Sequence, residues 1–458
     1  MSGPVVMKFG GSSVANAERL RNVADIVRSE DADGIVVVLS ALGGVTDALF
    51  SCGKTAAARN EAGALGGLGR IMERHREVAG ELFGGAVPDE LADFIAAAEH
   101  ELSLLLRGSA MLGALPDQSL DALVGHGELL SSRLLAAFMQ VPWLDARLVV
   151  RTDSRFGQAR PLPAEIRDLA GKEVLPILAR GGIVVTQGYI GSDASGAPTT
   201  LGRGGSDFSA SLFGAAIRAA EIQIWTDVEG VLTCDPRVVP DARPVEHLGY
   251  DEAAELAAFG AKVLHPATIL PAVELGIPVT VRNSLLRKGR FTSITRDASS
   301  GLPVTALASR APVSVLTVRS PGMLGGAGFL ARIFEAFGRR GVSVDLVSTS
   351  EVSVSMTVEA SAPLEGLAEE LSSFADVRIE RERAIVALVG EQLRRTPGVA
   401  GMAFSALRDM NVEMISLGAN EINLSLVVAQ SDAPEALRRL HAAFFGKENS
   451  GSVSKGVA

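Results

Sequence analysis

The residues best suited to chemistry begin with a lysine and two glycines near the N-terminus. Lys8, Gly10 and Gly11 lie in the stretch KFGGSS, directly after the apolar run VVM. Glycines let the backbone approach a ligand closely, and a helix that begins there presents free N–H groups and a partial positive charge. The stretch therefore predicts an anion site in which Lys8 contacts a phosphoryl oxygen. A tight strand-to-helix turn with a surface lysine would give the same pattern.

A second glycine pair follows the next apolar run, in LSALGGVTD at positions 39–47. The arrangement repeats that of the first stretch, because an apolar run again ends in a Gly-Gly turn. Asp47 has an ordinary explanation, since Asp commonly caps the first turn of a helix. Thr46 becomes a candidate for ligand binding only if the two turns lie side by side.

The strongest single signal is TTLGRGGSDFSAS at positions 199–211. A guanidinium binds a carboxylate through two parallel hydrogen bonds, so Arg203 suggests an acidic substrate. We expect Gly204, Gly205 and Ser206 to cradle a transferring phosphoryl group. Asp207 is interpreted as a functional carboxylate or as the N-cap of the helix that follows.

Three other stretches carry further polar candidates. In GHGELLS at 125–131, Glu128 is placed to bind an ammonium group or simply to favour the helix dipole. In IWTDVEGVLTCDPR at 224–237, Thr226, Asp227 and Arg237 fit a nucleotide site or ordinary turn chemistry. Lys262, in FGAKVLHP, is by itself no different from a solvated surface charge.

Several familiar sequence patterns are missing or misplaced. ALFSCGKT at 48–55 approximates a P-loop, but a P-loop follows its strand directly, whereas residues 47–58 look helical and Lys54 is expected at the surface. No G-x-G-x-x-G follows a strand, and neither H-E-x-x-H nor G-x-S-x-G occurs. Dinucleotide-binding folds, zincins and α/β-hydrolases are therefore disfavoured.

These stretches must be positioned by alternating strands and helices. Short aliphatic runs alternate with helical patterns, which predicts a mainly parallel sheet covered on both faces, with ligands at the carboxyl ends of its strands. The expected strands are Val5–Phe9, Ile35–Leu39, Leu148–Val150, Ile183–Thr186, Ile222–Trp225 and Val279–Val281. The expected helices include Ala17–Arg28, Glu90–Leu106, Gly127–Met139 and Asp207–Ala220.

The last third of the chain contains an internal repeat with an offset of 70 residues. GVSVDLVSTSEVSVSMTV at 341–358 matches NVEMISLGANEINLSLVV at 411–428, so Glu351 corresponds to Glu421. Each copy is expected to form strand, helix, strand, strand and helix, an order typical of ferredoxin-like units. Residues 286–312 are rich in Ser, Thr, Arg and Gly and are interpreted as a linker or an edge hairpin.

Composition narrows the class of protein. A length of 458 residues favours two or three domains, and the 47% of hydrophobic and 21% of charged residues are typical of a globular chain. The net charge of −10 argues against nucleic-acid and anionic-membrane partners. Cys52 and Cys234 form no motif, and no signal peptide or membrane-length apolar run is visible. A cytoplasmic protein is expected.

In combination and in this order, KFGGSSV, LVGHGELLS, TLGRGGSDFSAS, WTDVEGVLTCDPR and FGAKVLHPAT resemble aspartate kinases, particularly the single-chain lysine-sensitive bacterial type. The resemblance extends from residue 5 to about residue 445. It implies an α/β fold in which a three-layer amino-acid-kinase sandwich with a mainly parallel sheet precedes two ferredoxin-like (βαββαβ) ACT modules, which sense amino acids. The implied domains are a catalytic domain at 1–295, a linker at 296–312, ACT modules at 313–383 and 384–446, and a flexible tail at 447–458.

The reaction that the resemblance implies is phosphoryl transfer from ATP, with Mg²⁺, to the β-carboxylate of L-aspartate. The product, 4-phospho-L-aspartate, opens the routes to lysine, threonine and methionine. By the same resemblance, Lys8 contacts the transferred group, Asp207 orients Lys8, Arg203 binds the α-carboxylate and Glu128 binds the ammonium. The other implied substrate contacts are Thr46, Gly204, Gly205 and Ser206. The implied nucleotide contacts are Lys8, Gly10, Gly11, Ser12, Thr226, Asp227, Leu232, Arg237, Lys262 and Val263, and no metal-ligating residue is expected. Leu232 stands where relatives often have a Tyr.

The first ACT module also resembles a lysine site. Its implied members are Met323, Gly326, Phe329, Leu330, Val344, Asp345, Ser350 and Glu351. Asp345 and Glu351 suit the ammonium groups of lysine, and Gly326 replaces a Ser of relatives. The resemblance further implies feedback inhibition, by lysine or alternatively by threonine, and a homodimer or homotetramer formed through the ACT modules. An amino-acid-sensing protein with a degenerate kinase domain is the competing hypothesis.

Overall fold

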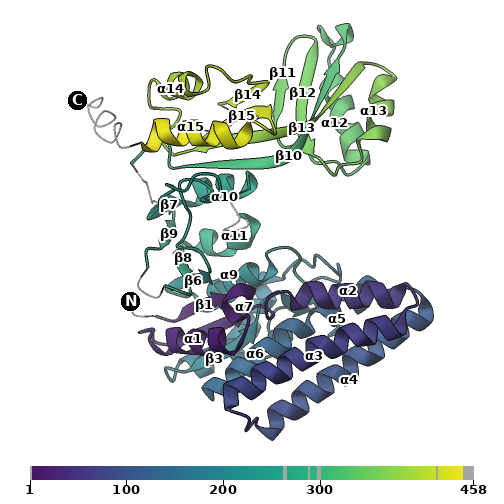
Figure 1. The fold of residues 1–458 in the computed structure, drawn as a ribbon, viewed down its shortest axis with the longest axis vertical. Coiled ribbons are helices and arrows are strands. Elements are labelled where there is room, and N and C mark those ends of the chain that lie inside the picture. The colour runs from purple at the N-terminus through teal and green to yellow at the C-terminus, as the bar shows by residue number, and fades with distance from the viewer. Residues whose placement is uncertain (1–2, 261–265, 287–288, 297–300, 419–420, 447–458) are drawn as a thin grey trace. The chain divides into compact units, whose positions relative to one another are not determined.

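A computed structural model describes residues 3–260, 266–286, 289–296, 301–418 and 421–446 (Figure 1). The chain forms two compact units. The first comprises Met1–Val231 and Val263–Ala298, and the second comprises Leu232–Lys262 and Ser299–Ala458.

A mainly parallel sheet forms the centre of the first unit. Its parallel strands run in the order β3 (Ile183–Gln187), β2 (Ile35–Leu39), β1 (Val5–Phe9), β6 (Glu221–Thr226) and β8 (Val279–Asn283), and β9 (Thr292–Thr295) joins β8 antiparallel. β1 and β2 are buried along their whole length, as expected for aliphatic strands covered on both faces. The loops after β1, β2, β3 and β6 therefore gather at one edge of the sheet.

Helices cover both faces of this sheet. On one face, Met7 and Val37 share a core with apolar side chains from α1 to α6. On the other face, α9 packs closely against the sheet. A Cβ on Gly214 would lie only 2.5 Å from Cδ1 of Ile222, so this contact requires a glycine. These helices are α1 (Ala17–Arg28), α2 (Val45–Ala57), α3 (Glu61–Phe83), α4 (Asp89–Leu112), α5 (Asp117–Val124), α6 (His126–Met139) and α9 (Gly205–Ile217). The result is the expected three-layer arrangement.

The first unit is completed by short elements and surface helices. They are the 3₁₀ turns η1 (Gly11–Val14) and η2 (Ala146–Leu148), the helices α7 (Pro163–Glu173), α8 (Leu175–Leu178) and α11 (Pro266–Leu275), and the hairpin of β4 (Ile190–Ser192) and β5 (Pro198–Thr200). The expected strand Leu148–Val150 is wrong, because the Asp145 side chain accepts the Arg147 N–H and supports the turn η2 there. The other expected strands and helices are confirmed, with shifts at their ends. α2 also confirms that the P-loop-like stretch is helical and that Lys54 is exposed.

An antiparallel sheet of six strands dominates the second unit. The strand order is β11 (Val347–Thr349), β12 (Ser353–Glu359), β10 (Ala306–Arg319), β13 (Asp376–Val389), β15 (Asn423–Ala429) and β14 (Met414–Leu417). The helices are α12 (Phe329–Arg339), α13 (Leu364–Ser372), α14 (Val399–Ala406) and α15 (Ala433–Phe445), with the turn η3 (Pro321–Met323). The order strand, helix, strand, strand, helix occurs twice, which confirms the two repeated modules.

The long strands β10 and β13 belong to both modules at once. Residues 306–310 of β10 pair with residues 385–389 of β13, and residues 315–319 pair with residues 376–380. Residues 306–312 therefore lie in a strand rather than in the expected linker, and the expected boundary between 383 and 384 falls inside β13. The sequence ALASRAP gives no strong strand signal, so pairing with β13 decides its structure.

The segment Leu232–Lys262 folds with the ACT modules rather than with the first unit, to which the sequence had assigned it. Cys234 and Val239 are buried in the core of the second module. The Glu252 carboxylate accepts hydrogen bonds from Thr305 Oγ1 at 2.6 Å and from the Glu391 N–H at 3.0 Å. β7 (His247–Gly249) and α10 (Tyr250–Ala258) lie in this segment. Across the described ranges, no helix is both long and apolar enough to cross a bilayer.

Candidate active site

A cavity of about 560 Å³ lies at the carboxyl edge of the parallel sheet. It is lined by the end of β1, by the loops after β2 and β3, and by the first residues of α2, α6 and α9. The cavity brings together nine of the residues expected from the sequence: Lys8, Gly11, Thr46, Glu128, Arg203, Gly204, Gly205, Ser206 and Asp207. Motifs from four separate parts of the chain therefore form one site.

Lys8 and Asp207 form an ion pair inside this cavity. Lys8 Nζ lies 2.6 Å from Asp207 Oδ1, and the side chains of Lys8 and Asp207 are only 11% and 16% exposed to solvent. Lys8 is the penultimate residue of the buried strand β1, and Asp207 lies in the first turn of α9. The pair holds the ammonium in place where the sheet and the helix meet.

Two helix N-termini also face the cavity. α2 and α9 both begin after a glycine in the left-handed region, Gly44 at φ 82° and Gly204 at φ 73°, and neither start has a side-chain cap. The N–H groups of Val45 and Gly205 donate to the Leu42 and Gly202 carbonyls, and no side chain caps the N–H groups that follow them. Each helix therefore contributes free N–H groups and a partial positive charge there. Together with Lys8 this arrangement suits a phosphoryl group.

Glu128 brings a buried carboxylate to the same cavity from the first turn of α6. Only 3% of the residue is exposed, and Oε2 has no hydrogen-bond partner among the described residues. Burial raises the pKa of Glu128 to about 8, although backbone hydrogen bonds from Ala41 and Glu128 itself oppose the shift. An incoming ammonium group would supply both the missing donor and the missing charge.

Arg203 provides the opposite charge. Its side chain is exposed and lines the cavity, and no ion-pair partner for it occurs in the described part of the chain. Thr46 and Ser206 add hydroxyl groups to the wall. A carboxylate, a guanidinium and hydroxyls around one space match the groups of an α-amino acid.

Three cavity residues outside the sequence motifs were missed by the sequence analysis. Gly157, Gln158 and Tyr189 line the wall, and none lies in a glycine-rich motif with charged residues. Tyr189 has a left-handed backbone with φ 69°, and its N–H donates to Ser209 Oγ at 2.9 Å. A Cβ on Gly205 would lie 2.7 Å from the Tyr189 ring, so this glycine makes room for the tyrosine. The position of Tyr189 two residues after the end of β3 was the available signal.

The expected nucleotide residues are only partly gathered. Gly10 donates its N–H to the Trp225 carbonyl at 3.2 Å, so the loop after β1 adjoins the end of β6, where Thr226 and Asp227 lie. Ser12 is exposed in η1. Neither Gly10 and Ser12 nor Thr226 and Asp227 line the cavity itself.

The other expected nucleotide residues lie elsewhere. Leu232 and Arg237 belong to the second unit, where Arg237 Nη2 lies 2.5 Å from Asp235 Oδ2. Lys262 and Val263 lie outside the described residues. Within the described ranges, no group of three or more His, Cys, Asp or Glu side chains is arranged to hold a metal ion.

A second expected site appears as a cavity of about 550 Å³ in the first ACT module. It is lined by Met323, Gly326, Phe329, Leu330, Thr349, Ser350 and Glu351. Six of the eight expected effector residues are therefore gathered. Val344 packs against the module core instead, and Asp345 Oδ1 lies 2.7 Å from Nη1 of Arg310.

The second module differs at the equivalent position. Glu421, which corresponds to Glu351, lies 3.1 Å from Arg394 and 3.5 Å from Arg395. In the second module, two arginines of the same module therefore already form ion pairs with the carboxylate. Glu351 has no such ion pair within the described residues.

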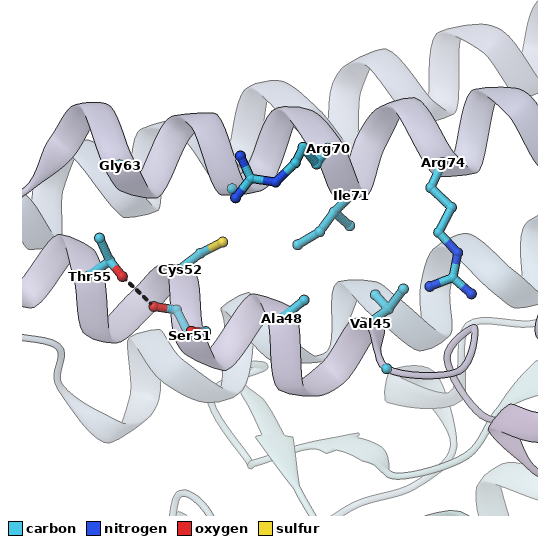
Figure 2. Close-up of a pocket in the computed structure, with 11 residues that line it drawn as sticks. Val45, Ala48, Ser51, Cys52, Thr55, Gly63, Arg70, Ile71 and Arg74 are labelled. Atoms are coloured by element: carbon cyan, nitrogen blue, oxygen red, sulfur yellow. Dashed lines mark hydrogen bonds between the residues drawn. The ribbon is translucent and has the colours of Figure 1, made fainter.

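Arg74 lies at one end of a further cavity, of about 300 Å³, between α2 and α3 (Figure 2). Its Nη1 donates to the Gly43 carbonyl at 2.8 Å, and its Nη2 donates to the Ala15 carbonyl at 2.9 Å. The guanidinium thus ties the turn before α2 to the segment that follows η1. Both loops belong to the edge of the sheet that carries the active-site cavity.

Comparison with known proteins identifies both parts of the chain. Residues 3–283 match the amino acid kinase family, and residues 316–363 and 386–444 match an ACT domain family. The lysine-sensitive aspartokinase 3 of Escherichia coli is 39% identical over 97% of this chain and 100% of its own length. The chloroplastic aspartokinase 3 of Arabidopsis thaliana is also 39% identical, over 98% of this chain and 83% of its own.

Solved structures agree with this assignment. One match is the Escherichia coli aspartokinase III in complex with aspartate and ADP, described as the R-state. The superposition covers 96% of this chain and 99% of the E. coli chain, with a TM-score of 0.84 and 39% sequence identity. The same enzyme in complex with lysine and aspartate, described as the T-state, has a TM-score of 0.80 at 38% identity and the same coverage. The chain belongs to the amino acid kinase family and, within it, to the aspartokinases.

Proposed function

We propose that this chain transfers the γ-phosphoryl group of ATP to the β-carboxylate of L-aspartate, and that lysine inhibits it through the first ACT module. The observation that carries the first part is the single cavity in which the buried Glu128 carboxylate, the Arg203 guanidinium and the Lys8–Asp207 pair meet. Family membership and the relative solved with aspartate and ADP support the choice of substrates.

The proposed nucleophile explains why the cavity needs no general base. A free aspartate side chain has a pKa near 4, so its carboxylate is already ionised at neutral pH. One carboxylate oxygen forms a bond to the γ-phosphorus while the bond to the bridging oxygen of ADP breaks, and no proton is transferred. Catalysis then depends on positioning and on neutralising negative charge.

The positive groups of the cavity supply that neutralisation. Lys8 contacts an oxygen of the transferring group, and the N-termini of α2 and α9 donate N–H groups to its other oxygens. Asp207 restricts the Lys8 ammonium to one position through the 2.6 Å contact. Glu128 binds the ammonium of aspartate and Arg203 its α-carboxylate, with Thr46, Gly204, Gly205 and Ser206 completing the substrate wall.

The residues near the cavity fit a nucleotide phosphate chain. A Cβ on Gly10 would lie 3.6 Å from Lys8 Nζ, so the loop after β1 passes close to the ammonium. We assign Gly10, Gly11 and Ser12 to the phosphates and Thr226 and Asp227 to the nucleotide beyond them. Leu232, Arg237, Lys262 and Val263 remain nucleotide contacts by resemblance. Mg²⁺ would be bound mainly by the phosphates, as is usual for this ion.

The effector proposal depends on the cavity of the first ACT module. Glu351 supplies a carboxylate for an ammonium group, and Met323, Phe329 and Leu330 line an apolar path for an alkyl chain. A Cβ on Gly326 would lie only 2.3 Å from the Gly322 carbonyl oxygen, so this turn has no room for the side chain that relatives carry there. The name of the lysine-sensitive relative supports lysine over threonine.

Association of two or more chains through the ACT modules is part of the same proposal. Val347 on β11 and Ile415 and Leu417 on β14 are large apolar residues that are 39%, 45% and 48% exposed. Burying them against another copy would stabilise an assembly.

The state of the cysteines bears on the compartment in which the chain works. The two free cysteines are buried, which suits a reducing cytoplasm.

A hydroxylamine trap tests the activity. The chain is incubated with ATP, Mg²⁺ and one acid at a time, and an acyl phosphate is captured as a hydroxamate. Hydroxamate should form with L-aspartate and not with L-glutamate. Hydroxamate formation from glutamate but not from aspartate, or no ATP-dependent hydroxamate from either acid, would overturn the proposed reaction.

A further inference from the structure

Asp121 is a buried carboxylate that holds two distant segments of the first unit together. It lies on α5 with only 2% of the residue exposed. Its Oδ2 accepts the Gly157 N–H and the Thr200 N–H, both at 2.8 Å. Its Oδ1 accepts the Thr200 hydroxyl, also at 2.8 Å. Three donors on one carboxylate offset the cost of burying it.

The two segments that Asp121 holds form the wall next to Arg203. Gly157 and Gln158 line the active-site cavity, and Ala159 donates its N–H to the Thr200 carbonyl at 2.9 Å. A Cβ on Gly202 would lie 3.1 Å from Cγ of Gln158, so the loop packs directly against the residue that precedes Arg203. Asp121 itself does not line the cavity.

Asp121 is also tied to the helix that carries Glu128. Gly125, at the start of α6, donates its N–H to the Asp121 carbonyl at 3.1 Å. A Cβ on Gly125 would lie 3.0 Å from Cγ2 of Ile190 and 3.2 Å from the Asp121 carbonyl, so the junction of α5 and α6 is closely packed and has little room for a side chain. Glu128 lies three residues beyond this junction, in the first turn of α6.

We propose that Asp121 is a positioning residue for the acidic amino acid, because it sets the distance between the Arg203 wall and the Glu128 helix. This inference rests on the proposed function of the cavity. Asp121 acts through the backbone of residues 157–158 and 200–203 and makes no contact with substrate. Its loss should therefore change the recognition of aspartate more than the binding of ATP.

Steady-state kinetics of Asp121→Ala and Asp121→Asn test the proposal. For Asp121→Ala, the KM for aspartate should rise by about tenfold or more, the effect of losing hydrogen bonds to a buried charge, while the KM for ATP stays within about twofold. Asp121→Asn should restore a KM close to that of the wild type. The amide oxygen can accept both N–H groups, and the amide NH₂ can donate to the Thr200 hydroxyl.

A matched control is Asp117→Ala, on the same helix. It removes an equal charge from an exposed residue and should leave both KM values unchanged. If Asp121→Ala does not fold, Thr200→Val removes only the hydroxyl donor and should raise the KM for aspartate by about threefold.

The outcomes separate the possible roles. A purely structural role would lower the amount of active enzyme, and hence kcat, without changing the KM for aspartate in any variant, which would overturn this inference alone. Equal increases of both KM values, or no rescue by Asp121→Asn, would overturn it as well. A wild-type chain that forms no hydroxamate from aspartate would overturn the proposed function, and this inference with it.

Discussion

Lys8 Nζ lies 2.6 Å from Asp207 Oδ1, so the ammonium of a strand end and the carboxylate of a helix start are joined inside one cavity. The lysine is almost enclosed, and its charge is balanced by one partner. In the proposed reaction the same ammonium faces the transferring phosphoryl group. The pair is therefore the part of the site that links the fold most directly to the chemistry.

Removing the charge of Lys8 should abolish most of the activity. Lys8→Met is expected to lower kcat by about 10²- to 10³-fold, the usual effect of losing one group that stabilises developing charge. Lys54→Met is the control, because Lys54 is exposed on α2 and lies over the Phe50 ring, outside the cavity. Hydroxamate rates measured on folded samples would compare the two. Near-normal turnover of Lys8→Met would rule out its proposed role.

The buried carboxylate of Glu128 should lower the stability of the folded chain at high pH while it supports the binding of substrate. Its folded pKa, about 8, lies above its ordinary value of 4.5, so the unfolded chain loses this proton first as pH rises. The contribution of Glu128 to stability is therefore complete at pH values below 4.5 and is lost as pH rises toward 8. Glu128→Gln should accordingly have a higher Tm than the wild type at pH 8 and a similar Tm at pH 5.

The same substitution should weaken substrate binding. Without a carboxylate for the ammonium group, the KM for aspartate is expected to rise by about tenfold or more. In the wild type, binding of aspartate at pH 7 should release a proton, seen as a buffer-dependent enthalpy in calorimetry. Glu90→Gln, on the exposed surface of α4, is the control for both measurements. An unchanged KM in Glu128→Gln would remove Glu128 from the substrate site.

Arg74 should be needed for the geometry of two loops. Its guanidinium donates to the carbonyls of both Gly43 and Ala15 (Figure 2). Arg74→Met is expected to lower kcat by about tenfold, because the loops after β1 and β2 lose a shared support. Arg74→Lys should not restore activity, since an ammonium lacks the planar fork that spans two carbonyls. Full activity of Arg74→Lys would show that charge alone suffices.

The two ACT modules provide a matched pair of carboxylates for testing inhibition. Glu351→Gln should raise the lysine concentration for half-inhibition by about tenfold, with kcat unchanged in the absence of lysine. Glu421→Gln changes the equivalent residue of the second module, where Arg394 and Arg395 already occupy the carboxylate. Its inhibition curve should match that of the wild type. The reverse result would place the effector in the second module.

Much of this site was accessible from the sequence, because glycines, strand ends and charged residues coincide there. Lys8 follows a fully aliphatic run, and Arg203 and Asp207 stand among glycines at a helix start. Parallel strands bring their carboxyl ends together, so these motifs were expected to meet. The cavity does gather them with Thr46 and Glu128.

Other parts depend on tertiary contacts that leave no local signal. Tyr189 reaches the cavity through a left-handed backbone next to Gly205, and Asp121 acts through loops that are distant in sequence. Residues 306–312 become a strand only because β13 pairs with them. The expected strand at Leu148–Val150 failed for the opposite reason, since the Asp145 side chain supports a tight turn there.

The most direct test of the central claim follows the oxygen atoms of aspartate. L-Aspartate with ¹⁸O in its β-carboxylate is incubated with the chain, ATP and Mg²⁺, and the product is observed by ³¹P NMR. The bridging oxygen of the acyl phosphate should carry ¹⁸O and shift its phosphorus signal upfield, because the carboxylate is the nucleophile. An acyl phosphate without the isotope shift, or inorganic phosphate as the only product that forms, would contradict the proposed reaction.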